Sequence, residues 1–167
     1  MTPQLQVAID QIIFARNYTL ELLNATDRAD WFRMPAESVS HIGWQVGHLA
    51  MAEYRLVLER VRGRQPGDEL LISELFLMQF GRESVPEPDP AKNPNLEEIR
   101  HSFDAVHRQA LHELPQLADD ELLEPPLKPH KLFTTKLGGL FWCSQHEMLH
   151  AGQLGLLRRL LGQKHLW

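Results

Sequence analysis

The sequence predicts an all-α protein in which four long helices form a bundle. Apolar residues recur at helical spacing in four separate stretches, whereas the alternating pattern typical of strands is weak. Each stretch begins or ends at a residue that favours a helix end. Long connections follow the second and third stretches, so the helices need not simply alternate in direction. The length of 167 residues is typical of one domain, and we expect a single domain over residues 1–167.

The first two predicted helices are bounded by residues that start or stop helices. The first begins at Thr2 and Pro3, a capping residue followed by a proline at the first helical position, and its pattern fades near Asn24. The second runs from about residue 40 to residue 62 and stops at Gly63. A glycine at this position is the usual end of a helix.

The third and fourth predicted helices carry similar signals. The third opens at Asn95 with Glu98 three residues later, which is a capping-box pattern, and Pro115 ends it. The fourth starts near Thr135 and ends at Gly162. The connection between the second and third helices contains an apolar segment, residues 69–80, that we expect to form a short helix packed over the bundle.

Composition excludes several classes of function. The net charge is −5 and no run of Lys and Arg occurs, which argues against a nucleic-acid partner and against a polybasic membrane contact. The single cysteine, Cys143, rules out an internal disulfide and fits a reducing cytosol. Neither a signal peptide nor an apolar stretch long enough to span a bilayer is visible. We therefore expect a cytoplasmic protein.

A pair of histidines near the end of the chain has the spacing of metal ligands. The segment HEMLHAGQLGLLRRLLG begins with His146, Glu147 and His150, as a metalloprotease helix would. Histidines four apart on a helix stack on one face with Cβ atoms about 5–6 Å apart, which suits a shared ion at about 2.0–2.1 Å. The simpler alternative is two core histidines bonded to the backbone or to each other. Buried imidazoles without a metal repel when charged and need partners when neutral, which favours the metal.

The other histidines have simpler explanations, because most histidines are exposed or singly hydrogen-bonded. His41 lies at the start of the second helix, where a capping or surface role is expected. Five more are not expected to be ligands: His101, His107, His112, His130 and His165.

The protease site cannot be completed in the usual way. Zinc proteases take their third ligand from downstream of the pair, as a histidine or a glutamate. One type of protease has a glycine three residues after the second histidine and the third histidine three residues further on, and here these two positions hold Gln153 and Leu156. The other type uses a downstream glutamate, and no Asp or Glu follows His150. Only His165 remains, near the terminus. The short motif therefore matches a protease helix without the rest of the protease site.

A third ligand is available upstream, in the second predicted helix. His48 lies in the segment SHIGWQVGHLAMAEY, with Trp44 one turn back on the same side. Bundle cores commonly build metal sites from facing helices. Gly43 and Gly47 leave a bare strip where a neighbouring helix can approach closely.

The segments GWQVGHLA and HEMLHAGQLGLLRRLLG, in this order and about a hundred residues apart, resemble the DinB/YfiT-like superfamily. The resemblance covers nearly the whole chain. It implies a four-helix bundle with an up-down-down-up arrangement and long crossover loops. It also implies one divalent metal ion, zinc or nickel, held by His48, His146 and His150, with Gln153 near the pocket. Together with Trp44, Gln153 is a candidate cofactor-binding residue.

The resemblance also implies what such a site does. Members with assigned activities include transferases that use low-molecular-weight thiols such as bacillithiol or mycothiol, and homodimers are frequent. The leading hypothesis is therefore a metal-dependent, thiol-dependent S-transferase or detoxification enzyme acting on a small molecule. A metal-water hydrolase on the same scaffold and a non-catalytic metal-binding sensor remain alternatives. A closed site with a fourth protein ligand would favour the last of these.

Overall fold

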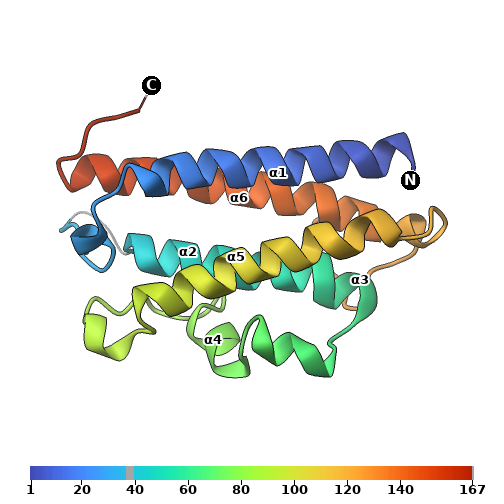
Figure 1. Cartoon of the computed structure of the whole chain (residues 1–167), viewed down its shortest axis with the longest axis horizontal. Helices are drawn as coiled ribbons and strands as arrows, with labels where there is room; N and C mark the ends of the chain where they lie inside the picture. The colour runs from blue at the N-terminus through green and yellow to red at the C-terminus, as the bar shows by residue number, and fades with distance from the viewer. Residues whose placement is uncertain (37–39, 167) are drawn as a thin grey trace.

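The computed structural model describes residues 1–36 and 40–166, and within these residues all regular structure is helical. Figure 1 shows four long helices lying side by side. They are α1 (Pro3–Asn24), α2 (Ile42–Glu53), α5 (Leu96–Glu113) and α6 (Lys136–Leu160). The prediction of an all-α bundle is confirmed.

The long helices follow an up-down-down-up order, with α1 parallel to α6 and α2 parallel to α5 (Figure 1). Side-chain contacts between α1 and α6 keep a nearly constant sequence offset, as Ser144 Oγ meets Gln11 Oε1 at 3.5 Å and Glu147 Oε1 meets Arg16 Nε at 2.9 Å. The predicted topology is therefore confirmed. No helix among the described residues is long and apolar enough to cross a membrane.

The predicted helix ends agree with the caps in the structure. The Thr2 hydroxyl accepts from the Leu5 N–H at 3.2 Å, and Thr135 caps α6 in the same way. Asn95 and Glu98 form the reciprocal capping box expected of α5. These contacts satisfy N–H groups that have no partner inside the helix.

The second predicted helix is less regular than its apolar pattern indicates. It begins at Ile42, and His41 is its N-cap, with Nδ1 accepting from the Trp44 N–H at 3.1 Å. His41 is fully buried, so a surface role for it is wrong. After α2 the chain forms a π-helical segment, Tyr54–Glu59, and then the single turn α3 (Arg60–Arg62). Helices of the π type are rare and often lie at functional sites.

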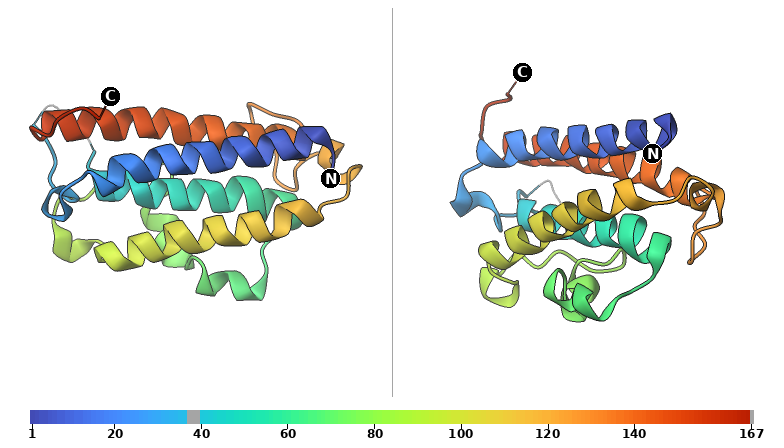
Figure 2. Two further views of the ribbon diagram at one scale, coloured as in Figure 1. Left: turned by 45° about the horizontal axis from the view of Figure 1, so that its top comes forward. Right: turned by 45° about the vertical axis from the view of Figure 1, so that its right-hand side comes forward.

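The short helix predicted for residues 69–80 is only partly present. The chain forms a 3₁₀ turn at Pro66–Leu70 and then α4 (Glu74–Gln79), which Ser73 caps through a bond to the Phe76 N–H. This connection lies on the side of the bundle formed by α2 and α5, away from α1, in both views of Figure 2. Further 3₁₀ turns occur at Arg28–Asp30, Pro90–Lys92, Leu114–Gln116 and Glu121–Leu123.

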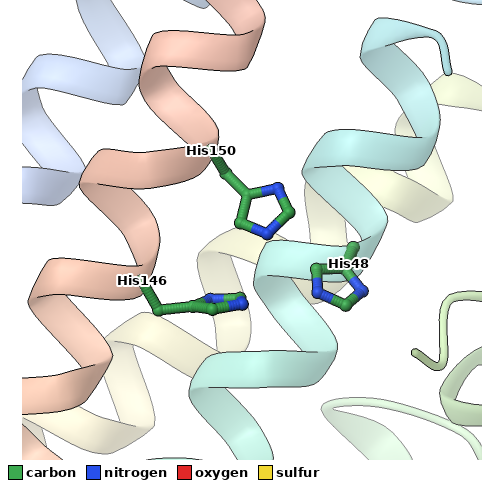
Figure 3. Close-up of side chains that lie close together, drawn as sticks. All are labelled: His48, His146 and His150. Atoms are coloured by element: carbon green, nitrogen blue, oxygen red, sulfur yellow. The ribbon is translucent and has the colours of Figure 1, made fainter.

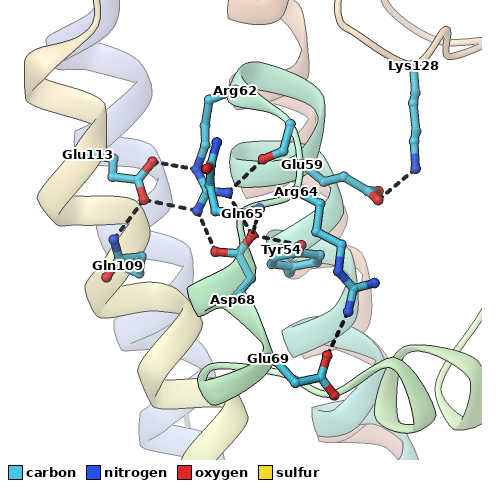
Figure 4. Close-up of polar contacts among 11 residues, drawn as sticks. Tyr54, Glu59, Arg62, Arg64, Gln65, Asp68, Glu69, Gln109, Glu113 and Lys128 are labelled. Atoms are coloured by element: carbon cyan, nitrogen blue, oxygen red, sulfur yellow. Dashed lines mark hydrogen bonds and ion pairs between the residues drawn. The ribbon is translucent and has the colours of Figure 1, made fainter.

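A polar cluster ties the chain after α3 to α5 (Figure 4). The Arg62 guanidinium pairs with Asp68 at 2.7 Å and with Glu113 at 2.8 Å, while the Tyr54 hydroxyl donates to Asp68 at 2.9 Å. Burial raises the pKa of Tyr54, and the Asp68 carboxylate raises it further. Through Tyr54, the first residue of the π-helical segment, and Arg62 of α3, the cluster links this part of the chain to α5.

Candidate metal centre

The structure brings three histidines together between α2 and α6. His48 comes from α2, and His146 and His150 come from α6, with the three rings turned toward one another (Figure 3). One potential ligand nitrogen from each ring lies within 4.8 Å of those of the other two. The predicted set therefore forms a possible three-histidine metal site, built from facing helices as expected.

Two of the imidazoles are oriented by hydrogen bonds on their outer nitrogens. His48 Nδ1 donates to the Phe80 carbonyl at 2.8 Å, and His150 Nδ1 donates to Gln45 Oε1 at 2.5 Å. Because both partners are carbonyl oxygens, each Nδ1 carries the proton and each Nε2 keeps its lone pair for a ligand bond. Metal-binding histidines are typically fixed in this way, so the donor set fits a divalent ion.

The same three imidazoles are neutral near pH 7. Burial lowers the pKa of His146 to about 4 and that of His150 to about 3, and the neighbouring imidazoles contribute to both shifts. Burial also lowers the pKa of His48, with a further contribution from the positive charge of Arg55. A neutral imidazole is the form that binds a metal, so little proton release opposes binding at neutral pH.

The bare strip predicted at Gly43 and Gly47 is filled by aromatic side chains from loops and not by a neighbouring helix. A Cβ atom on Gly47 would lie 2.4 Å from the Phe80 ring, and one on Gly43 would lie 2.9 Å from Phe32. The absence of a side chain at Gly47 lets Phe80 pack directly on α2. The Phe80 carbonyl then lies beside His48 Nδ1.

The two candidate cofactor-binding residues lie in different environments. The Trp44 ring stacks on His48 with centroids 4.8 Å apart, and its Nε1 donates to Ser84 Oγ at 3.0 Å. Gln153, on α6 beyond His150, is exposed. The glutamine that contacts a site histidine is Gln45, which sequence reasoning missed. The one sequence feature that could have indicated Gln45 is that it is a polar residue inside the apolar segment GWQVGHLA.

Glu147, the glutamate of the protease-like motif, is engaged elsewhere. Its carboxylate pairs with Arg16 of α1 at 2.9 Å, and Arg16 also pairs with Glu53 of α2 at 2.6 Å and donates to the Phe103 carbonyl of α5 at 2.7 Å. Arg16, Glu53 and Glu147 are each no more than 3% exposed. This buried cluster joins all four long helices, and it leaves Glu147 unable to serve as a general base at the histidines.

Cys143 belongs to the surroundings of that cluster. It is a free thiol, 3% exposed. Burial raises its pKa well above the usual value, and the Glu53 and Glu147 carboxylates raise it further. A buried thiol that stays protonated is a small core residue and not a nucleophile.

Comparison with known families and solved structures agrees with the fold. The model of the DinB superfamily matches residues 11–154. The chain belongs to the DinB superfamily. A crystal structure of a conserved protein from Enterococcus faecalis has the same fold as this DinB chain, with a TM-score of 0.73 and 19% identity over 98% of this chain and 99% of that one. No curated protein matches the sequence.

A groove of about 640 Å³ lies apart from the histidines of this DinB chain. It runs between the α4 region and the start of α5, with Leu71, Phe76, Asn95 and His101 among its lining residues. None of the three clustered histidines lines it.

Proposed function

We propose that this chain is a metal-dependent enzyme that acts on a small-molecule substrate, with a zinc or nickel ion held by His48, His146 and His150. The observation that carries the proposal is the pair of hydrogen bonds from His48 to Phe80 and from His150 to Gln45. These bonds fix ring orientation before any ligand arrives. Histidines that only fill a core have no need for Nε2 lone pairs that point toward a common centre.

The leading candidate reaction is the transfer of a low-molecular-weight thiol to an electrophile. When bound, the ion would lower the pKa of a thiol or water in an open coordination position and so supply an anionic nucleophile. The chain offers no thiolate of its own, because Cys143 is buried and its pKa is raised. The nucleophile would therefore be a second small molecule, held beside the Trp44 and Trp142 rings that flank the histidines.

A metal-water hydrolase remains the second candidate, since the same three neutral ligands suit it equally. The non-catalytic alternative is less favoured, because a structural site is normally closed by a fourth protein ligand. Across residues 1–36 and 40–166, the cluster contains three potential ligands from His, Cys, Asp and Glu side chains and no fourth.

We also propose that the chain forms a homodimer in the cytosol. The support for a dimer is apolar exposure on the two helices that lie side by side, with Phe14 of α1 64% exposed and Leu149 of α6 59% exposed. A free buried thiol with no disulfide is compatible with a reducing compartment. Light scattering during gel filtration tests the dimer, and a monomer at micromolar concentration would remove it.

The reaction is tested with metal-loaded wild type, a panel of small thiols and monobromobimane as the electrophile. The expected result is metal-dependent conjugation that His150→Ala abolishes. Hydrolysis of ester or amide substrates without thiol consumption would favour the hydrolase. No turnover of either kind, with one tightly held ion, would favour the sensor.

A further inference from the structure

The two helices that carry the three histidines are also joined by one buried arginine. The Arg16 guanidinium of α1 donates from Nη2 to Glu53 Oε2 of α2 at 2.6 Å and from Nε to Glu147 Oε1 of α6 at 2.9 Å. Glu53 follows His48 by five residues on α2, and Glu147 directly follows His146 on α6. One side chain from a third helix therefore bridges the two helices between which the metal centre lies.

The Arg16 guanidinium is also fixed against α5. Its Nη1 donates to the Phe103 carbonyl at 2.7 Å, and its Cζ lies 3.5 Å from the centroid of the Phe103 ring. Because a guanidinium is planar and its N–H donors point in fixed directions, bonds to three helices leave it little freedom to move. The carboxylates of α2 and α6 are in turn held at that position.

Glu53 is held from a second side by His107 of α5, whose Nδ1 lies 2.7 Å from Glu53 Oε1. Although burial raises the pKa of Glu53, the charge of Arg16 and the contact with His107 lower it overall. The Glu53 carboxylate is therefore ionised at neutral pH. Its bond to Arg16 is a charge-assisted hydrogen bond, which is shorter and stronger than a neutral one.

The two carboxylates lie on other sides of their helices than the histidines. Since an α-helix turns by about 100° per residue, Glu147 is about 100° from His146 and Glu53 is about 140° from His48 around the helix axis. Across residues 1–36 and 40–166, the group of potential ligands comprises the three histidines and neither of these carboxylates. The cluster around Arg16 can therefore affect the metal centre through the positions of α2 and α6, and not by coordination.

We infer that Arg16 is a positioning residue of the three-histidine centre, because its bonds to Glu53 and Glu147 set the spacing of α2 and α6 at which the imidazoles can share one ion. The inference rests on the proposed function and adds a residue on which metal binding depends. Ligand distances in a metal site are fixed to within about 0.2 Å, so a small shift of one helix lowers affinity. Glu147→Gln keeps the link between the helices, since its amide oxygen can still accept from Arg16 Nε.

The test measures the cobalt(II) affinity of wild type, Arg16→Lys and Arg158→Lys by competition with a chromophoric chelator. Lysine keeps the positive charge at position 16, but one ammonium cannot reproduce the rigid fork that bonds α2, α5 and α6. We expect Arg16→Lys to bind cobalt at least about tenfold less tightly, the lower end of the range for loss of a residue that orients a ligand. The visible absorption bands of the bound cobalt should also shift, because they depend on ligand geometry.

Arg158→Lys is the matched control, since Arg158 is another buried arginine of the bundle. It is 3% exposed, and it joins α6 to the chain just after α1, donating to Thr26 Oγ1 at 3.0 Å and to the Ala25 carbonyl at 2.8 Å. Arg158→Lys should lower the melting temperature but leave the cobalt affinity and spectrum unchanged. Equal losses of cobalt affinity in the two variants would show that affinity only follows stability, and would overturn the inference. Wild-type affinity in a folded Arg16→Lys protein would overturn it as well.

If Arg16→Lys does not fold, the neutral triple variant Arg16→Met/Glu53→Gln/Glu147→Gln takes its place, because it removes the buried charges together and leaves none unpaired. Weaker cobalt binding by this variant would support the inference, and unchanged binding would overturn it. His150→Ala separates the inference from the proposed function. Cobalt binding that His150→Ala does not affect would remove the three-histidine centre and both proposals with it. Loss of binding in His150→Ala together with full binding in Arg16→Lys would remove the role of Arg16 alone.

Discussion

His150 and Gln45, which are 105 residues apart in the sequence, form a hydrogen bond of 2.5 Å in which the imidazole Nδ1 donates to the amide oxygen. The bond links α6 to α2 and turns His150 Nε2 toward His48. Gln45 is 3% exposed, so its amide is held in place by the surrounding core. The orientation of a site residue thus depends on a residue that is not itself a ligand candidate.

Replacement of Gln45 by Leu should weaken metal binding without unfolding the protein. Loss of an outer partner of a ligating histidine typically costs about 10–100-fold in metal affinity. Affinity is measured by competition with a chromophoric chelator, and circular dichroism checks the fold. Unchanged affinity in Gln45→Leu would show that the hydrogen bond has no part in orienting His150.

Gly47→Ala should lower both stability and metal affinity. The added Cβ would lie 2.4 Å from the Phe80 ring, and displacing Phe80 also moves the carbonyl that accepts from His48. Overpacking of this kind costs about 1–3 kcal/mol. Gly152→Ala, on an exposed part of α6 with no atom within 4 Å of the new Cβ, is the control. It should raise stability by up to about 1 kcal/mol in urea unfolding, as Ala favours helix over Gly.

Glu147→Gln should keep the metal site and lose stability. The substitution leaves Arg16 with Glu53 as its remaining anionic partner, and breaking a buried ion pair costs about 3–5 kcal/mol. Urea unfolding should register a loss near the lower end of that range, since Glu53 still compensates the charge. Wild type should have no peptidase activity. A peptidase activity that disappears in Glu147→Gln, together with normal stability, would restore the protease hypothesis.

Stability of the metal-free protein should fall as the pH is lowered from about 6.5 toward 5. The folded pKa values of about 4 for His146 and about 3 for His150 lie below the usual unfolded value of about 6.5. In this window the unfolded chain binds protons that the folded chain does not, so acid favours unfolding. The prediction is tested by measuring the melting temperatures of metal-free wild type and of the double variant His146→Gln/His150→Gln across this pH range. Parallel pH profiles for the two proteins would contradict it.

The sequence was sufficient to predict the capped helix ends and the histidine pair of α6, because both depend on residues three or four positions apart. Thr2, Asn95 and Thr135 act as caps through bonds to residues three positions away, so their roles can be predicted from adjacent sequence. The histidines of α6 share a face because they are one turn apart. His48 could be selected as their partner from helix order.

The remaining features depend on contacts between distant segments. The π-helical segment at 54–59 has the same apolar character as an α-helix, so its hydrogen-bond shift is invisible in the sequence. The Arg16, Glu53 and Glu147 cluster joins residues up to 131 positions apart. Gln45 and the Phe80 carbonyl become partners of His150 and His48 only when the loop and the helices have packed. For this reason the role of Gln45 could not be predicted from the sequence.

The most direct test of the central claim is the metal affinity of His48→Ala. Wild type should retain about one divalent ion per chain after purification without chelator, as expected of three converging imidazoles. His48→Ala should bind it more than about 100-fold less tightly, beyond the range for loss of an outer partner, while keeping the helical circular dichroism of wild type. A folded His48→Ala protein that holds the ion as tightly as wild type would contradict the three-histidine centre.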